Sequence, residues 1–498
     1  GRSDNENDSA SQPKAPETNT LPPAGNPEDS AEEYTLLSRQ ELLDAVDAYV
    51  QDPSGFPSIG TWNVSAVSDF TAIFSKFRNP AMESFNEPLA GWDVSAGTKF
   101  SSIFDHAMAF DQDMSTWDVS RASSLESMFY FAVTFNGNVS NWNVSSCWDL
   151  SHLFHGAQTF NQDVSQWDTS SAILMSNTFD FASVFNQDVS AWTTSRVEMM
   201  KFLFSKAVEF NQDISSWDTS RVESMEYMFH RAEKFNQDIS GWDTRKVENM
   251  RRFFYGALAF NQNLTNWDVS KVYEFSHAFE VAPLFNGDIT SWNMANAENI
   301  SCMFAEAVSF DQDISLWRLP LVTDMSELFR GASLFNQDIS RWDMSAVVKT
   351  NGMFQDASTF NQDISLWDVS SVERMDSMFE GALKFNQNIG KWRVDRATTM
   401  KSMLDGASSF NQNLSSWTNL SQVTDMESLF RDCIAFKGDV SNWDVSRVTS
   451  MANMFQNAIL FNGDISSWDV SRVEEMISMF KDNASFNQDV SGWNATSV

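Results

Sequence analysis

Tryptophan recurs at a fixed interval along almost the whole chain, and this regularity constrains the fold more than any other feature. From Trp92 to Trp417 the residue stands every 25 positions, and after one 26-residue step the interval continues to Trp493. Trp62 precedes the series, and only Trp148 lies outside its register. A fixed period of this length predicts a repeat architecture, which overrides the three or so globular domains that 498 residues would otherwise suggest.

Each unit reads W-D-V-S-x-V-x-x-M-x-x-M-F-x-x-A-x-x-F-N-Q-D-I-S-x. In one copy, Val222, Met225 and Ala232 fall at helical spacing, and Ser220 stands before them as an N-cap. The apolar residues around Trp217 have the spacing of a short inward-facing strand. We therefore expect an α/β repeat solenoid: a leucine-rich-repeat-like, right-handed stack of about 18 strand-plus-helix units with a parallel sheet and a strand spacing of about 4.8 Å.

The chain divides into three expected regions. Residues 1–33 form a polar N-terminal arm, expected to be disordered unless it docks on a partner. Residues 34–60 hold a capping helix, with Ser38 and Glu41 as a capping box, and the loop into the first repeat. Residues 61–498 form the solenoid, without a recognisable C-terminal cap, and an insertion around 76–82 is expected to bulge outward. The solenoid core is expected to contain a tryptophan column that includes Trp117, Trp217, Trp242, Trp342, Trp367 and Trp468.

Composition and motifs exclude several functions. A formal net charge of -34 argues against nucleic acid and anionic membranes as partners, and no segment is apolar over the length of a membrane span. The 5 histidines are scattered, and no phosphate loop, nucleophile elbow or zinc motif occurs. The 3 cysteines lie far apart, which argues against a disulfide framework. We expect no enzyme activity, no catalytic residues and no cofactor.

Two polar columns recur with the repeat. Asp218, Asp243 and Asp268 each follow a tryptophan and are expected to form a row on the concave face, which makes them weak candidates for a Ca²⁺ site. The alternative is that each carboxylate accepts a hydrogen bond from a nearby backbone amide. Asn161, Asn186 and their counterparts in other repeats are expected to form an asparagine ladder that satisfies loop backbone.

Asn-x-Ser/Thr sequons are frequent, and they become glycosylation sites only in a secreted chain. Some arise where the repeat's usual aspartate is replaced by asparagine. The candidates in the expected cap and solenoid are Asn63, Asn138, Asn143, Asn263, Asn299, Asn413, Asn419, Asn483 and Asn494.

The phrases FNQDISSWDTSRVESMEYMF and FNQDISLWDVSSVERMDSMF resemble the BspA-family leucine-rich-repeat surface proteins, in the 25-residue variant known from mycoplasma-type lipoproteins. The resemblance runs from about residue 34 to 498. It implies an extracellular or cell-surface location and a role in adhesion or interaction. It implies no catalytic residues, because the family motif is structural.

Two functional hypotheses follow. The first is a structural or interaction protein that assembles with itself, head-to-tail into a filament or surface matrix, using the polar arm and the uncapped terminal repeat. The second is a monomeric adhesin or receptor ectodomain that binds a ligand on an acidic concave face. The expected partners are further copies, other surface proteins or glycans.

Overall fold

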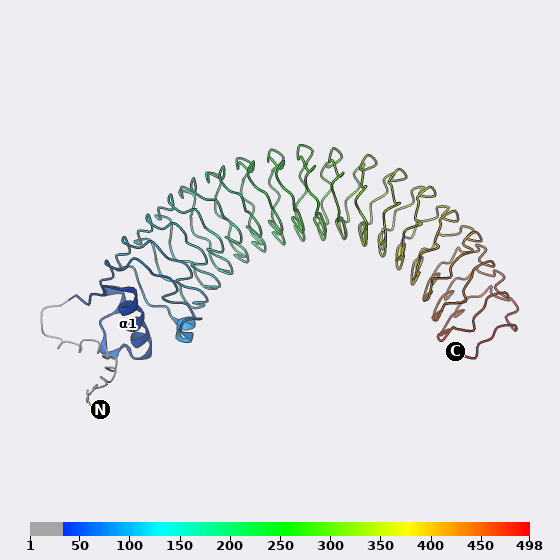
Figure 1. The fold of residues 1–498 in the computed structure, drawn as a ribbon, viewed down its shortest axis with the longest axis horizontal. Helices are drawn as coiled ribbons and strands as arrows, with labels where there is room; N and C mark the ends of the chain where they lie inside the picture. The colour runs from blue at the N-terminus through cyan, green and yellow to red at the C-terminus, as the bar shows by residue number, and fades with distance from the viewer. Residues whose placement is uncertain (1–32) are drawn as a thin grey trace, which may run out of the picture.

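The computed structural model describes residues 33–498, which form one curved stack of repeats (Figure 1). Within this range the helices lie at the N-terminal end: α1 (Arg39–Gln51) and three short 3₁₀ helices, η1 (Pro53–Gly55), η2 (Ile59–Thr61) and η3 (Pro80–Ser84). None of the helices in residues 33–498 has the length and apolarity needed to cross a membrane. The expected arm lies outside the described residues, apart from residue 33.

From residue 85 to residue 498 the repeats contain no helix, so the strand-plus-helix unit expected from the sequence is wrong in its second half. Isolated parallel bridges join equivalent residues of successive repeats, as in Ser224 with Asn249 and Asn249 with Glu274. These residues lie in the segment expected to be helical, several positions after the tryptophan expected in the strand. The solenoid is therefore held by a narrow parallel strip rather than by a layer of helices.

Successive tight turns replace the expected helix. The amide of Met228 donates to the carbonyl of Met225, and the amide of His230 donates to that of Tyr227. Tyr227 adopts a left-handed φ of 57°, as does Arg231 at 55°. The same two positions are left-handed in most repeats, and in six repeats glycine occupies one of these two positions.

Inter-repeat hydrogen bonds explain this choice. The amides of Tyr227, Phe229 and Arg231 donate to carbonyls of the following repeat at 2.9, 3.0 and 2.6 Å. An α-helix would use these amides within its own repeat. A left-handed residue costs roughly 1–2 kcal/mol, and the turns offset that cost by linking neighbouring repeats. Both structures bring residues three and four positions apart to one face, so the apolar pattern alone does not separate them.

Aromatic columns fill the interior. The ring centroids of Trp217 and Trp242 lie 6.4 Å apart with the planes 2° from parallel. Phe235 stacks on Phe260 at 6.1 Å, and Phe229 on Phe254 at 5.7 Å. The six representatives of the expected tryptophan column are all buried, whereas Trp148 is 43% exposed: Trp117, Trp217, Trp242, Trp342, Trp367 and Trp468.

The stack is an arc, and its curvature places these columns (Figure 1). Parallel bridges require a spacing of about 4.8 Å between repeats, whereas the indoles of Trp217 and Trp242 are 6.4 Å apart. In an arc, spacing grows with distance from the centre of curvature. The tryptophan column therefore lies nearer the outer side of the arc than the bridge strip does.

Helix α1 covers the first repeat. Ser38 Oγ accepts from the amide of Glu41 at 3.2 Å, and the buried face includes Leu42 and Val46. The insertion around residues 76–82 packs against this helix, since Arg78 donates to both carboxylate oxygens of Asp47 at 2.7 Å. The insertion that was expected to bulge outward thus connects helix α1 to the solenoid through the Arg78–Asp47 ion pair.

The last described repeat is less covered than the others. Phe480, Phe486, Val490 and Trp493 are only partly buried, although they occupy core positions. The counterpart of Trp493 one repeat earlier, Trp468, is 3% exposed. These side chains lack the neighbour that every earlier repeat has.

Candidate functional site

The recurrent aspartates hold turns. Asp218 Oδ1 accepts a hydrogen bond from the amide of Ser220 at 3.0 Å. Asp268 does the same with Ser270 at 3.0 Å. Asp243 Oδ1 accepts from the amide of Arg245 at 3.1 Å. Each carboxylate therefore has a structural partner two residues along the chain.

These hydrogen bonds dominate the electrostatics of the column. The pKa of Asp218 is lowered, first by its bonds with Ser220, although the neighbouring carboxylate of Asp243 acts in the opposite direction. The pKa of Asp243 is lowered chiefly by the side chain of Arg245. Ionised aspartates are thus stable here without a cation, and Ca²⁺ binding at Asp218, Asp243 and Asp268 stays a prediction.

The aspartates of this column lie at the surface. Each follows a buried tryptophan, and Asp218 and Asp268 are exposed while Asp243 is partly exposed. Successive side chains of extended backbone alternate in direction, which places the aspartates on the solvent side of the tryptophan column. Their expected place on the concave face stays a prediction.

The asparagine ladder is present. Asn186 Oδ1 accepts from the amide of Asn211, and Asn211 Oδ1 accepts from that of Asn236, both at 2.9 Å. Gln237 Nε2 donates to the backbone carbonyl of Asn211 at 2.9 Å. One asparagine per repeat thus satisfies the backbone of the next repeat.

The sequons have a structural origin in the same turns. Asn143 Oδ1 accepts from the amide of Ser145 at 3.1 Å, and Asn413 Oδ1 accepts from that of Ser415 at 2.9 Å. The aspartates make the same bond to the serine two residues on. Replacing Asp by Asn in an Asp-x-Ser turn therefore creates a sequon automatically. The abundance of sequons follows from the repeat and does not indicate secretion.

The candidate asparagines differ in exposure. Asn483 has a buried Nδ2 atom, the atom that would carry a glycan. Of the rest, Asn63, Asn138 and Asn299 are partly buried, and the exposed ones are Asn143, Asn263, Asn413, Asn419 and Asn494. Glycan attachment stays a prediction, restricted by geometry to the exposed set.

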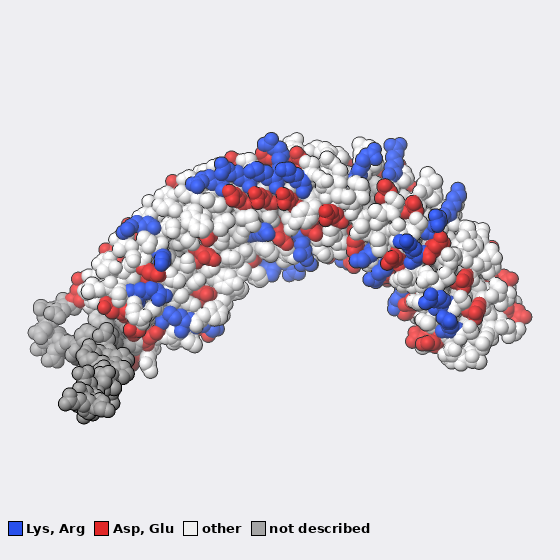
Figure 2. Space-filling model, in the orientation of Figure 1, with Lys and Arg blue, Asp and Glu red and all other residues white. Residues whose placement is uncertain are grey.

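Two rows of opposite charge run side by side over the middle of the arc. The acidic row consists of the exposed residues Glu198, Glu223 and Glu248, whose backbones are joined by hydrogen bonds of 3.1 and 3.0 Å. Two positions earlier in each repeat stands an exposed basic residue, and these form the basic row: Arg196, Arg221, Lys246 and Lys271. Figure 2 shows basic side chains gathered beside acidic ones in this part of the molecule. Sequence reasoning did not predict these rows, because the aspartate columns recur in more repeats. Aligning the repeats at their 25-residue period shows both rows.

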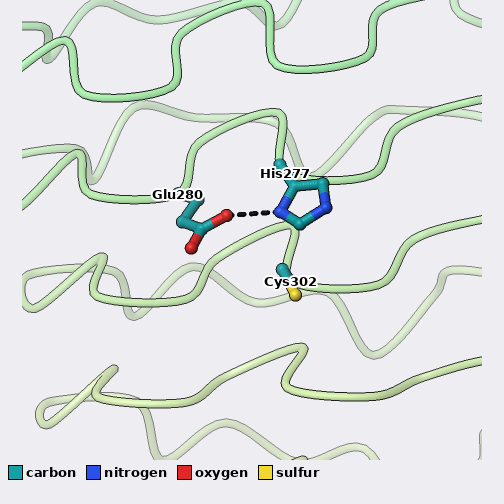
Figure 3. A group of neighbouring side chains, drawn as sticks. All are labelled: His277, Glu280 and Cys302. Atoms are coloured by element: carbon teal, nitrogen blue, oxygen red, sulfur yellow. Dashed lines mark hydrogen bonds and ion pairs between the residues drawn. The ribbon is translucent and has the colours of Figure 1, made fainter. Parts of the chain in front are cut away.

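A second cluster brings together three metal-ligating residue types (Figure 3). His277, Glu280 and Cys302 each offer one ligand atom, and all three atoms lie within 4.8 Å of one another. His277 Nδ1 and Glu280 Oε2 are joined by a hydrogen bond. The cluster lies among the tight turns that replaced the expected helix.

The surroundings of the cluster are acidic. Burial raises the pKa of Cys302 to about 12, and Glu327 and Glu280 act in the same direction. Arg330 Nη2 lies 3.5 Å from Glu280 Oε1, while its Nε donates to Glu327 Oε2 at 2.8 Å. The sequence reading of the cysteines missed this cluster, because it looked for spacings within one segment. Aligning repeats would have shown His277 and Cys302 at one register position.

A family model described as "Mycoplasma protein of unknown function, DUF285" matches the chain in five overlapping segments, at residues 46–167, 125–242, 233–321, 313–417 and 409–498. The chain belongs to this family. The DUF285 match agrees with the resemblance seen in the sequence at the level of a repeat-protein family. No curated protein matches the chain.

Solved structures similar to this DUF285 chain include a leucine-rich cell surface protein from Faecalibacterium prausnitzii, with 12% identity, a TM-score of 0.34, and coverage of 69% of this chain and 78% of that one. The Drosophila Toll–Spätzle complex matches with 10% identity, a TM-score of 0.19 and coverage of 86% and 61%. The mouse RP105/MD-1 complex matches with 9% identity, a TM-score of 0.20 and coverage of 78% and 68%. At these TM-scores the likenesses are distant, and the solenoid assignment rests on the repeat geometry.

Proposed function

We propose that the chain is a non-enzymatic interaction protein of the cell surface that associates with further copies of itself. The carrying observation is the pair of charged rows, basic at Arg196, Arg221, Lys246 and Lys271 and acidic at Glu198, Glu223 and Glu248. The surface location rests on the resemblance to BspA-family surface proteins.

Two adjacent rows of opposite sign are self-complementary. A second copy related by a two-fold axis that runs between the rows would place its basic row over the acidic row of the first. Both contacts form at once, as in any isologous interface. Each exposed pair contributes at most about 1 kcal/mol, so the association should be weak and should decrease as salt is raised.

Charge-swapped variants test this arrangement. One variant carries Glu198→Lys, Glu223→Lys and Glu248→Lys, and the other carries Arg196→Glu, Arg221→Glu and Lys246→Glu. Each variant alone should be monomeric in sedimentation equilibrium at low salt. A mixture of the two should associate, because each supplies the row that the other has lost. A monomeric wild-type protein at low salt, or a mixture that fails to associate, would overturn the proposal in favour of a monomeric adhesin.

A matched control separates these rows from overall charge. Glu33→Lys, Glu87→Lys and Glu209→Lys reverse three carboxylates outside the rows, and so change the net charge as much as the acidic-row variant does. This control variant should associate like the wild type.

Labelling of intact cells with a membrane-impermeant reagent tests the proposed location, since a surface protein is labelled without lysis.

A further inference from the structure

We propose that His277, Glu280 and Cys302 form a Zn²⁺-binding site that joins two neighbouring repeats. The three ligand atoms lie within 4.8 Å of one another, before any ion has drawn them together. His277 and Glu280 belong to one repeat and Cys302 to the next, so the ion would cross-link the stack (Figure 3).

The backbone brings the ligands together. His277 and Cys302 are 25 residues apart and occupy the same register position in consecutive repeats. Both are left-handed, with φ of 59° and 54°, so the two turns share this feature of their backbone conformation. The amide of His277 donates to the carbonyl of Ser301 at 2.9 Å, which fixes one turn against the other. The stacking of equivalent turns therefore brings the imidazole close to the thiol.

The donor set suits zinc. Imidazole nitrogen, carboxylate oxygen and cysteine sulfur are its usual protein ligands, and three of them with an open fourth position is a common arrangement. A thiolate and a carboxylate would balance the two charges of the ion. Calcium and magnesium prefer oxygen ligands only, so they do not fit this set.

Nearby charged groups leave the site open to a cation. Arg330 is the nearest guanidinium, but it also pairs with Glu306 and Glu327, which spreads its charge over three carboxylates. At the same register position one repeat before His277, Arg252 lies over the ring of Tyr227 with its Cζ 5.5 Å from the centroid. Arg330 thus shares its charge between Glu280 of the site and two carboxylates outside it, and Arg252 lies over an aromatic ring.

The two buried histidines lack such a set. His155 lies 3.2 Å from Asp180, and His230 lies 3.4 Å from the hydroxyl of Ser205. Within residues 33–498, His277 alone belongs to a group of three potential ligands. A simple histidine–carboxylate contact, such as that of His155 with Asp180, contains no thiol. The thiol of Cys302 beside His277 distinguishes the proposed site.

The test uses chelator-treated protein titrated with Co²⁺ and Zn²⁺. We expect one Co²⁺ per chain, with the near-ultraviolet absorption of a thiolate–cobalt bond, and displacement of that Co²⁺ by Zn²⁺. Cys302→Ala and His277→Gln should each remove the absorption band and weaken Zn²⁺ binding by at least tenfold. The matched controls Cys147→Ala and Cys433→Ala, at buried free cysteines, should leave both unchanged.

A second measurement needs no variant. Stoichiometric Zn²⁺ should slow alkylation of Cys302 in the wild-type protein, read by mass spectrometry of the peptide that contains it. Absence of protection, or Zn²⁺ binding that is the same in Cys302→Ala and wild type, would overturn the proposal and assign the metal to the acidic surface.

Discussion

The indole Nε1 of Trp242 donates a hydrogen bond to the backbone carbonyl of Ile214, 3.1 Å away and 28 residues earlier in the chain. The corresponding bond recurs from Trp217 to Val189 at 3.0 Å and from Trp267 to Ile239 at 3.0 Å. Each of these three tryptophans therefore fills the core of its repeat and satisfies a buried backbone acceptor three residues before the preceding tryptophan of the column. This double role favours tryptophan at the register position, although the buried Nε1 of Trp317 has no hydrogen-bond partner.

Replacing Trp242 by Phe should lower the free energy of unfolding by about 2 kcal/mol, because the carbonyl of Ile214 loses its donor and the core loses volume. Urea denaturation followed by circular dichroism measures the change. Trp148→Phe is the matched control: that residue is 43% exposed, and its replacement should change stability by less than about 0.5 kcal/mol. Equal effects of the two variants would contradict the coupling.

The asparagine ladder gives a second prediction. Asn211→Ala should lower the free energy of unfolding by about 1–3 kcal/mol, because the amide of Asn236 loses the acceptor now 2.9 Å away. Asn211→Asp keeps an oxygen in the same place and should cost less than the alanine variant. Urea midpoints of the two variants measure the difference, and an aspartate variant as unstable as the alanine one would show that the acceptor is not what matters.

The period, the buried residues and the polar ladder could be predicted from the sequence, because all three follow from residue identity in register. The helix could not. Val222, Met225 and Ala232 satisfy helical spacing and successive tight turns equally well, since both place every third or fourth residue inside. Residues such as Tyr227 and Arg231 have no intrinsic preference for a left-handed φ, and only their inter-repeat hydrogen bonds select it. The sequence signal for the left-handed turns was the glycine that other repeats carry at the equivalent positions.

The left-handed turns make glycine replacements informative. Gly406 has a φ of 69°, and an added Cβ would meet nothing closer than 3.6 Å, so Gly406→Ala tests backbone strain without a clash. We expect a loss of about 1–2 kcal/mol. Gly241 is the control, because its φ lies outside the left-handed range and nothing lies within 4 Å of an added Cβ. Gly241→Ala should leave the thermal midpoint unchanged or raise it slightly, and a similar fall in both variants would contradict the turn assignment.

The candidate sites could be predicted only in part, for a related reason. The aspartates of the turns stood out because they recur in nearly every repeat, and frequent recurrence marks a structural role. At their shared register position cysteine occurs only at Cys302 and histidine only at His152 and His277, and the proximity of His277 to Cys302 depends on two repeats being stacked. A pattern read along the chain does not contain that contact, whereas a pattern read down the aligned repeats does.

Burial of His230 predicts a pH dependence of stability. Its pKa is lowered from 6.5 to about 3, first by burial and then by the cations of Lys206, Arg231 and Arg252. The unfolded chain takes up a proton near pH 6.5, while the folded chain stays neutral at this residue until about pH 3. The unfolded state therefore binds more protons between these values, and stability falls as pH is lowered. Asp180 acts with the opposite sign, because burial raises its pKa to about 6, and the stability it contributes is lost as pH rises through that value.

The contribution of His230 is isolated by comparing the wild type with His230→Gln, in which Asp180 is retained. Between pH 7 and pH 5 the wild type should lose about 2 kcal/mol more stability than the variant, which corresponds to about 1.5 pH units below an unfolded pKa of 6.5 at 1.36 kcal/mol each. Urea unfolding at the two pH values measures both slopes in matched buffers. Parallel slopes would mean that the folded and unfolded states take up the proton of His230 at the same pH, so that burial does not lower the pKa of this residue.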